Sequence, residues 1–272
     1  MAILLYISIA YVSVFIHEFG HYIVAYLFGV RATHVVTGMG FKVFSVQTRH
    51  TRFIFNLFPG GGVTIYNPND EIKLSTFHQI IVLLSGVTLN YLTAALCASL
   101  YIGQNFLNGI HYLNHLMINF IQNIFTLLSL QDLIFPNHTF NESINMIADH
   151  YSTQNFILFI FIFMNLLLFL FNLIPIPFFD GGQILSLLID PILYKIGISP
   201  SSLETFKDYI SRAVGFFLIS LIILPLIGQF HQKIMNSHNP FAELLKWILI
   251  ILGAILIQRI FKTLTRLIKS DH

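Results

Sequence analysis

The stretch ILLYISIAYVSVFIHEFGHYIVAYLFGV, residues 3–30, decides the fold. It is apolar, and it is longer than the roughly 20 residues that a helix needs to cross a bilayer. HEFGH, residues 17–21, places two histidines and a glutamate inside this run. A charged side chain at the middle of a bilayer costs on the order of 2.5 to 3.5 kcal/mol on insertion scales. The sequence therefore predicts a retained transmembrane helix whose polar residues are paired or functional.

The composition predicts an integral membrane protein built from α-helices. The mean hydropathy is +0.76, and 56% of the 272 residues are hydrophobic while 10% are charged. Soluble domains carry about 25% charged residues. Four further apolar runs are predicted to span the membrane: residues 77–102, 156–173, 213–230 and the shorter 241–257. The formal net charge is only +2 and the basic residues form no stripe, so we expect no nucleic-acid partner.

The distribution of basic residues predicts how the chain is oriented. Five lie between residues 31 and 73, three between 195 and 212, and four between 259 and 269, whereas residues 103–155 contain none. With five spans, these three basic groups fall on the same side of the membrane, and the positive-inside rule makes that side cytoplasmic. We therefore expect the N-terminus outside, the C-terminus in the cytoplasm, and residues 103–155 as an extracytoplasmic connection.

The spacing of the polar residues in HEFGH predicts a metal site. Residues four apart share one face of a helix, so His17 and His21 point to the same place and Glu18 lies beside them. Zinc in hydrolases takes three protein ligands and keeps one position for water, which a neighbouring glutamate deprotonates. We predict that both histidines bind zinc and that Glu18 is the catalytic base. A chance match of the pattern is disfavoured inside a span, because an uncompensated glutamate is costly there.

A second polar anomaly, FNLIPIPFFDGGQ at residues 171–183, predicts the third ligand. Its two prolines each remove an amide donor, so the helix before them must break. Broken backbone at membrane depth survives only where it lines a cavity or is buried in protein. We predict that Asp180, at the turn, completes the metal site, and that the following Gly-Gly pair lets the backbone pass close to a neighbour. The alternative makes Asp180 the N-cap of a helix that starts near Ile184.

These motifs together closely resemble the site-2 proteases, a family of zinc metalloproteases that cut their substrates within the membrane. The match rests on HEFGH at residues 17–21 and NLIPIPFFDGG at residues 172–182. GMGFKVFSVQTRHTRFIFNLFPGGGV, residues 38–63, is similar to the membrane re-entrant β-loop of the family, and LLSGVTLNY, residues 83–91, resembles a motif of its second helix.

The resemblance implies a role for each matching residue. His17, His21 and Asp180 would be the Zn²⁺ ligands and Glu18 the catalytic base. Four residues would line or support the substrate path: Asn172, Gly61, Gly62 and Asn90. The resemblance also implies an integral protein of a bacterial inner membrane.

Residue types between the first two helices predict a β-hairpin. Residues 35–46 and 52–63 are rich in β-branched and aromatic side chains, and the polar residues 47–50 separate them. A hairpin inserted near the zinc would offer an unpaired edge to a substrate segment that has unwound. The alternative is a small structural hairpin that caps the helices. The predicted fold is thus an α-helical polytopic membrane protein with about five transmembrane helices and a re-entrant β-hairpin between helices one and two.

The chain is predicted to be a single membrane-embedded domain, residues 1–272. Residues 103–155 are too few for the PDZ domain that many bacterial family members carry between the second and third helices. Within them, residues 112–130 suit either a helix in the outer interface or an extra span. His111 and His115 repeat the four-residue spacing but lack a following glutamate, so we do not expect a metal there.

The predicted function is that of an intramembrane zinc endopeptidase that cleaves transmembrane segments of membrane-protein substrates. Its expected partners are a transmembrane protein or peptide substrate and the lipid bilayer. One alternative is a metal transporter or a non-catalytic zinc-binding membrane protein. Another is a membrane protease that trims prenylated C-termini, although its third ligand is usually a glutamate.

Overall fold

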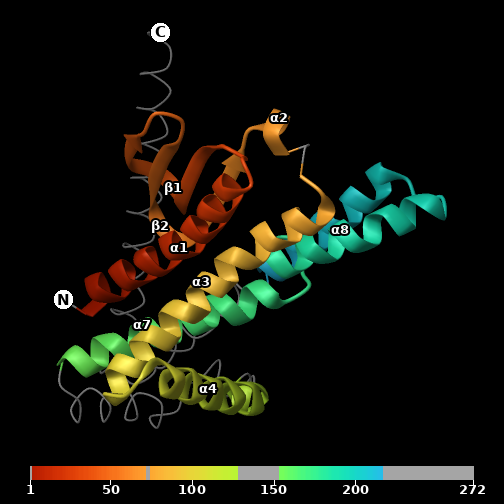
Figure 1. The fold of residues 1–272 in the computed structure, drawn as a ribbon. Helices are drawn as coiled ribbons and strands as arrows, with labels where there is room; N and C mark the ends of the chain where they lie inside the picture. The colour runs from red at the N-terminus through yellow and green to blue at the C-terminus, as the bar shows by residue number, and fades with distance from the viewer. Residues whose placement is uncertain (1, 72–73, 128–152, 217–272) are drawn as a thin grey trace, which may run out of the picture. The chain divides into compact units, whose positions relative to one another are not determined.

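The computed structural model describes residues 2–71, 74–127 and 153–216 (Figure 1). Apart from residues 125–127, they belong to one compact unit. Its elements are α1 (Ala2–Leu27), β1 (Ala32–Gln47), β2 (Arg52–Tyr66), α2 (Pro68–Glu71), α3 (Thr76–Ile102), α4 (Phe106–Leu127), α7 (Thr153–Leu173), α8 (Asp180–Lys195) and a helical stretch at 200–216. Except for residues 213–216, the predicted spans 213–230 and 241–257 lie outside the described residues.

Three helices in the described part of the chain are long and apolar enough to cross a membrane. They cover Leu4–Leu27, Thr76–Ile102 and Asn155–Leu173. The first three predicted spans are thus confirmed as helices long and apolar enough to cross a membrane, which supports the integral membrane class. Helix α4 begins at Phe106, before the predicted 112–130 segment, and is not one of the three.

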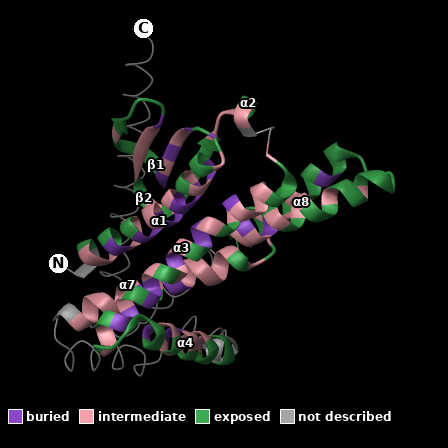
Figure 2. Cartoon of the chain, in the orientation of Figure 1, coloured by how far each residue is buried: buried purple, intermediate pink, exposed green. Residues whose placement is uncertain are grey.

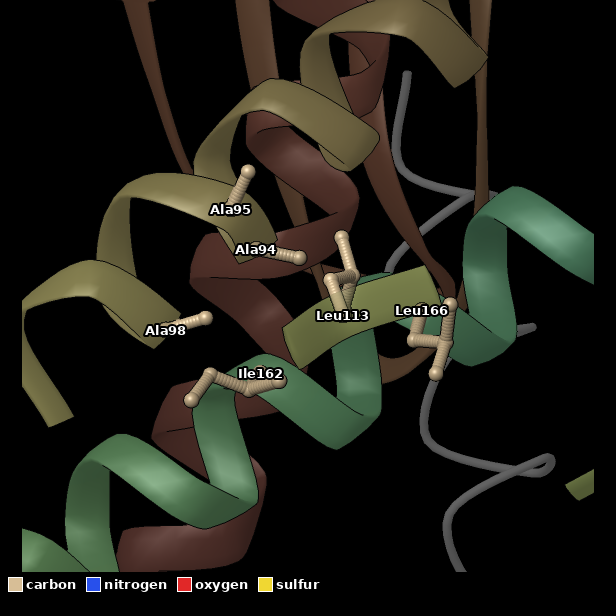
Figure 3. Packing of buried hydrophobic residues seen from close by; sticks show 6 residues of the cluster. All are labelled: Ala94, Ala95, Ala98, Leu113, Ile162 and Leu166. Atoms are coloured by element: carbon tan, nitrogen blue, oxygen red, sulfur yellow. The ribbon is translucent and has the colours of Figure 1, made fainter. Parts of the chain in front are cut away.

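Small side chains bring α3 close to α7 and α4. Ala94, Ala95 and Ala98 of α3 are fully buried against Leu113 of α4 and against α7 (Figure 3). In a bilayer, helices associate mainly through close packing and hydrogen bonds, since lipid tails are as apolar as the side chains. Figure 2 shows buried positions along α1, α3 and α7.

The predicted β-hairpin is confirmed: β1 begins earlier and ends later than expected, and β2 begins at Arg52 as expected but ends later. Each strand bends, so residues 34–37 of β1 pair with 62–65 and also with 52–55 of β2, while 42–47 pair with 52–56. Gly38, with φ +88°, lies at the bend, where a Cβ would come 2.7 Å from the carbonyl oxygen of Phe58. In this register, and among the described residues, 62–65 have strand partners on one side only.

The hairpin packs on α1 through aromatic rings and leaves other apolar side chains uncovered. Phe15 of α1 lies 5.8 Å from Phe55, measured between ring centroids. Met39, Phe41 and Phe58 are each more than half exposed within the described part of the chain. Soluble proteins rarely expose contiguous apolar surface of this kind, so the hairpin suits contact with lipid or with an apolar partner.

The expected helix break is also confirmed. Helix α7 ends at Leu173 and α8 begins at Asp180. The N-cap alternative for Asp180 is wrong: Phe179 is the N-cap, without a side-chain cap bond, and the helix starts before Ile184. A Cβ on Gly181 would lie 2.5 Å from the carbonyl oxygen of Leu173, so the turn brings the start of α8 against the end of α7.

Candidate metal centre

Helix α1 places three polar side chains side by side in its buried half. His17, Glu18 and His21 are each at most 6% exposed. The two imidazole rings meet edge to face, and their Nε2 atoms are 3.1 Å apart. His17 and His21 therefore point to the same place, as predicted from their spacing, and both Nε2 atoms are directed to one point.

Asp180 reaches the same point from the start of α8. Its Oδ2 atom lies 3.1 Å from Nε2 of His17 and 3.4 Å from Nε2 of His21. In a regular tetrahedral site with bonds of about 2.0 to 2.1 Å to the metal, ligand atoms lie about 3.3 to 3.4 Å apart. Among the described residues, these three form the one group of histidine, cysteine and acidic side chains that could hold a metal ion.

The carboxylate of Asp180 itself supports this assignment. Its Oδ2 atom is buried and has no hydrogen-bond partner among the described residues. A buried carboxylate oxygen without a partner is costly, whereas a divalent cation would satisfy it. The donor set of two imidazoles and one carboxylate also fits a catalytic zinc ion, which keeps a further position open.

Both histidines are held through their other ring nitrogen by α3. Nδ1 of His17 donates to Oδ1 of Asn90 at 2.8 Å, and Nδ1 of His21 donates to the carbonyl oxygen of Val82 at 2.8 Å. A histidine whose Nδ1 carries the proton has a free lone pair on Nε2. These contacts leave both Nε2 atoms available as ligands.

A glycine makes this approach of α3 feasible. A Cβ on Gly86 would lie 2.5 Å from Cε1 and Nε2 of His21 and 2.9 Å from Cε1 of His17. On the α1 side, a Cβ on Gly20 would come 2.7 Å from the carbonyl oxygen of Ser85. The small residues of the LLSGVTLNY stretch therefore provide the space that the imidazoles occupy.

Strand β2 covers the glutamate. The Thr64 hydroxyl donates to Oε2 of Glu18 at 2.7 Å. Gly62 lies against the same carboxylate, because a Cβ there would come 2.6 Å from Cγ and Oε1 of Glu18. The edge of the hairpin thus holds one oxygen of Glu18 and leaves no room for a side chain at residue 62.

The other predicted substrate-path residues take different places. Gly61, with φ +149°, lies next to Met39 within the hairpin. Asn172 is in the last turn of α7, where its Nδ2 donates to the carbonyl oxygen of Leu168 at 2.9 Å. Asn90 is fully buried and contacts a metal-site histidine. Its position favours a supporting role, while substrate contacts by Gly61 and Asn172 stay predictions.

Sequence reasoning missed three residues that the structure brings into or next to the site: Thr64, Gly86 and Asn165. Asn165 donates and accepts hydrogen bonds deep between α7, α1 and α3. It is an amide in a strongly apolar helix, a signal that was visible in the sequence.

For the second histidine pair, His111 and His115 are both exposed, and no third ligand joins them among the described residues.

The fold and site define an integral membrane protein in which the two histidines of HExxH and a distant aspartate form a group that could hold a metal ion. The model of peptidase family M50 matches residues 5–222, most of the chain. The chain therefore belongs to peptidase family M50, the site-2 protease family, which confirms the resemblance.

Three curated relatives match shorter segments. A protein of Fusobacterium nucleatum is 36% identical over 89 residues, one of Thermotoga maritima 44% over 62, and one of Clostridium perfringens 33% over 89. These segments are 30%, 23% and 30% of this chain but only 26%, 12% and 27% of the relatives' own lengths. Each relative is named as a zinc metalloprotease, and zinc is thus the metal that the names imply.

Proposed function

We propose that this protein is an intramembrane zinc endopeptidase that cleaves transmembrane segments of membrane-protein substrates. The observation that carries the proposal is the triangle of buried ligand atoms from His17, His21 and Asp180. The two histidines and the neighbouring Glu18 lie on α1, a helix able to span a membrane. Membership of a peptidase family supports hydrolysis of protein substrates.

The side chains of the site divide the chemistry among them. His17, His21 and Asp180 would hold the metal. A bound zinc ion would supply a Lewis acid that polarises the scissile carbonyl and lowers the pKa of water. Glu18 would take a proton from the attacking water and deliver it to the leaving amine. The Thr64 hydroxyl fixes Oε2 of Glu18, so the carboxylate is oriented before substrate arrives.

The hairpin edge beside Glu18 is where we place the substrate. A transmembrane helix hides its peptide bonds in its own hydrogen bonds, so it must unwind before cleavage. Within the part of the chain that the structure describes, residues 62–65 have strand partners on one side only, and an unwound segment could pair with the other side as an added strand. We propose that the hairpin is re-entrant and that Gly61 and Asn172 line the path. Helix-destabilising residues in a substrate should then favour cleavage.

Membrane orientation follows from the basic residues. We propose that the N-terminus lies outside and the C-terminus in the cytoplasm of a bacterial inner membrane. His17 is 14 residues beyond the start of the apolar run at residue 3, or roughly 21 Å along a helix. The site would then lie beyond mid-membrane, and water would reach it from the cytoplasmic side.

The test is cleavage of a tagged transmembrane reporter by purified wild type and Glu18→Gln in detergent, with zinc measured in both. We expect about one zinc in each protein and cleavage by wild type alone, because glutamine keeps the shape of the side chain but cannot take a proton. Equal cleavage by the two proteins would refute the base assignment. Zinc in both with cleavage of no reporter by either would favour a binding or transport role.

The transporter alternative has less support in the described spans. A transit path needs a series of acidic or histidine ligands across the membrane. Within Leu4–Leu27, Thr76–Ile102 and Asn155–Leu173, Glu18 is the one acidic residue. The described spans thus offer a single metal site.

A further inference from the structure

A chain of buried amides links α7 to the metal site. Asn90 of α3, Asn165 of α7 and Ser13 of α1 are each 0% exposed. Nδ2 of Asn90 donates to Oδ1 of Asn165 at 2.7 Å and to the Ser13 carbonyl oxygen at 3.2 Å. Nδ2 of Asn165 donates to Oγ of Ser13 at 3.0 Å and to the Phe161 carbonyl oxygen at 2.9 Å. The chain ends at His17, whose Nδ1 donates to Oδ1 of Asn90.

Two backbone carbonyls fix the direction of every hydrogen bond in this chain. A carbonyl oxygen can only accept, so the amide nitrogen of Asn165 must face Phe161 and its oxygen must face Asn90. The nitrogen of Asn90 must likewise face Asn165 and the Ser13 carbonyl, which turns its oxygen toward His17. A flip of either amide would set oxygen against oxygen in a site without exposed surface, where unpaired polar groups are costly.

This fixed direction determines which nitrogen of His17 carries the proton. Because the oxygen of Asn90 can only accept, Nδ1 of His17 must donate and Nε2 keeps its lone pair. If Asn90 turned its nitrogen toward His17 instead, the proton would move to Nε2, the atom that lies 3.1 Å from Oδ2 of Asp180. His17 could then not bind a metal.

We propose that Asn165, acting through Asn90, is a positioning residue that holds His17 in its metal-binding tautomer. The inference rests on the proposed metal site. Helix α7 would then contribute to the metal site twice: it leads into the turn before Asp180, and it supplies Asn165 from within the span. It also accounts for a buried amide in an apolar helix, where such a residue is otherwise costly.

A purely structural role for Asn165, as a polar contact between helices, makes a different prediction. If the side chain only filled space and joined helices, leucine would replace it better than aspartate, because a buried acid is costly in a membrane span. The tautomer role reverses this order. In its neutral form, aspartic acid keeps an oxygen for the Asn90 nitrogen and a hydroxyl for the Phe161 carbonyl, whereas leucine offers neither.

The experiment compares Zn²⁺ and Co²⁺ binding by the full-length chain in detergent, after metal removal, in competition with a chromophoric chelator. The variants are Asn165→Leu and Asn165→Asp. The matched control is Asn114→Leu, which breaks another bond to α3, the 2.8 Å contact with the Tyr91 hydroxyl, outside the hydrogen-bond chain that ends at His17. The visible absorption of bound Co²⁺ reports the ligand set independently of any cleavage.

We expect Asn165→Leu to weaken Zn²⁺ binding by about tenfold or more and to alter the Co²⁺ spectrum, as for other outer partners of metal-binding histidines. Asn165→Asp should bind more tightly than Asn165→Leu, and Asn114→Leu should bind as wild type does. Asn165→Ala, which introduces no larger side chain, should weaken binding in the same way and replaces the leucine variant if that does not accumulate.

Three results would overturn the proposal. Equal Zn²⁺ affinity of wild type, Asn165→Leu and Asn165→Ala would show that the amide chain does not act on His17. Tighter binding by the leucine than by the aspartate variant would indicate a packing role instead. Absence of metal binding by wild type would refute the metal site itself, and the role of Asn165 with it.

Discussion

Gly86→Ala tests the contact between α3 and the two imidazoles. The new methyl carbon would lie 2.5 Å from Cε1 and Nε2 of His21 and 2.9 Å from Cε1 of His17. Carbon atoms in contact are normally about 3.5 to 4.0 Å apart, so the shortfall toward His21 is about 1 Å. Either the ring or the helix must move by that amount.

Neither movement is cheap, because His21 is bound to α3 itself. A retreat of α3 by about 1 Å would stretch the 2.8 Å bond from Nδ1 of His21 to the Val82 carbonyl beyond hydrogen-bonding distance. Overpacking of this kind costs about 1 to 3 kcal/mol of stability. Loss of a histidine's outer partner typically lowers metal affinity about 10- to 100-fold. We therefore expect Gly86→Ala to lose zinc affinity in that range and to lose reporter cleavage at limiting zinc.

The assay is zinc competition on the apoprotein, with melting temperature and reporter cleavage measured on the same samples. Gly215→Ala is the matched control: it is also a helical glycine, but a Cβ there meets no atom within 4 Å among the described residues. It should leave zinc affinity unchanged and stabilise slightly, by about 0.4 to 1 kcal/mol. Wild-type zinc affinity in Gly86→Ala would refute the close approach of α3 to the imidazoles.

Two further predictions concern the hairpin and the end of the described chain. Thr64→Val should lower kcat about 10- to 150-fold while zinc content stays the same, because a hydrogen bond to a charged group contributes about 1.5 to 3 kcal/mol. Thr64→Ser should restore turnover, and an unchanged kcat in the valine variant would contradict the role of the hydroxyl. Partial burial lowers the pKa of Lys207, but its hydrogen bond and charge interaction with Asp190 raise it more, and the net pKa shift is upward. The Lys207–Asp190 pair should thus stabilise the protein up to the ordinary lysine pKa, and this stabilisation should be lost as pH rises through the raised value. Lys207→Met should accordingly lower the melting temperature equally at pH 7 and 9. The double variant with Asp190→Asn should recover part of the loss. If wild type and Lys207→Met melted at the same temperature at pH 9, the upward shift of the Lys207 pKa would be contradicted.

The residues of the candidate metal centre could be predicted because each is unusual in a membrane-spanning sequence. The histidines and Glu18 stand out in an apolar run, and their spacing alone places them on one helix face. Asp180 stands out because the prolines before it end the helix. The structure brings the three predicted ligands together, and all of them are buried.

The contacts around those residues could not be predicted in the same way. Thr64 and Gly86 are ordinary residue types for a strand and a membrane helix, and their roles depend on which face of that strand or helix turns toward α1. The bend that pairs residues 34–37 with two segments of β2 likewise depends on long-range register. Asn165 was visible as an amide in an apolar span, but its partners, 75 and 152 positions away in sequence, could be found only from the fold.

In the proposed mechanism, different elements would serve metal binding and proton transfer within one small site. Helix α3 contacts both imidazoles through Nδ1, and α8 provides the carboxylate next to their Nε2 atoms, so these helices would control whether the metal is held. The hairpin touches the Glu18 carboxylate through Thr64. It also carries the edge that we propose for substrate. A substrate strand added there would lie beside the base without displacing a ligand partner. Substrate binding could therefore reorient Glu18 and alter turnover while the metal stays bound.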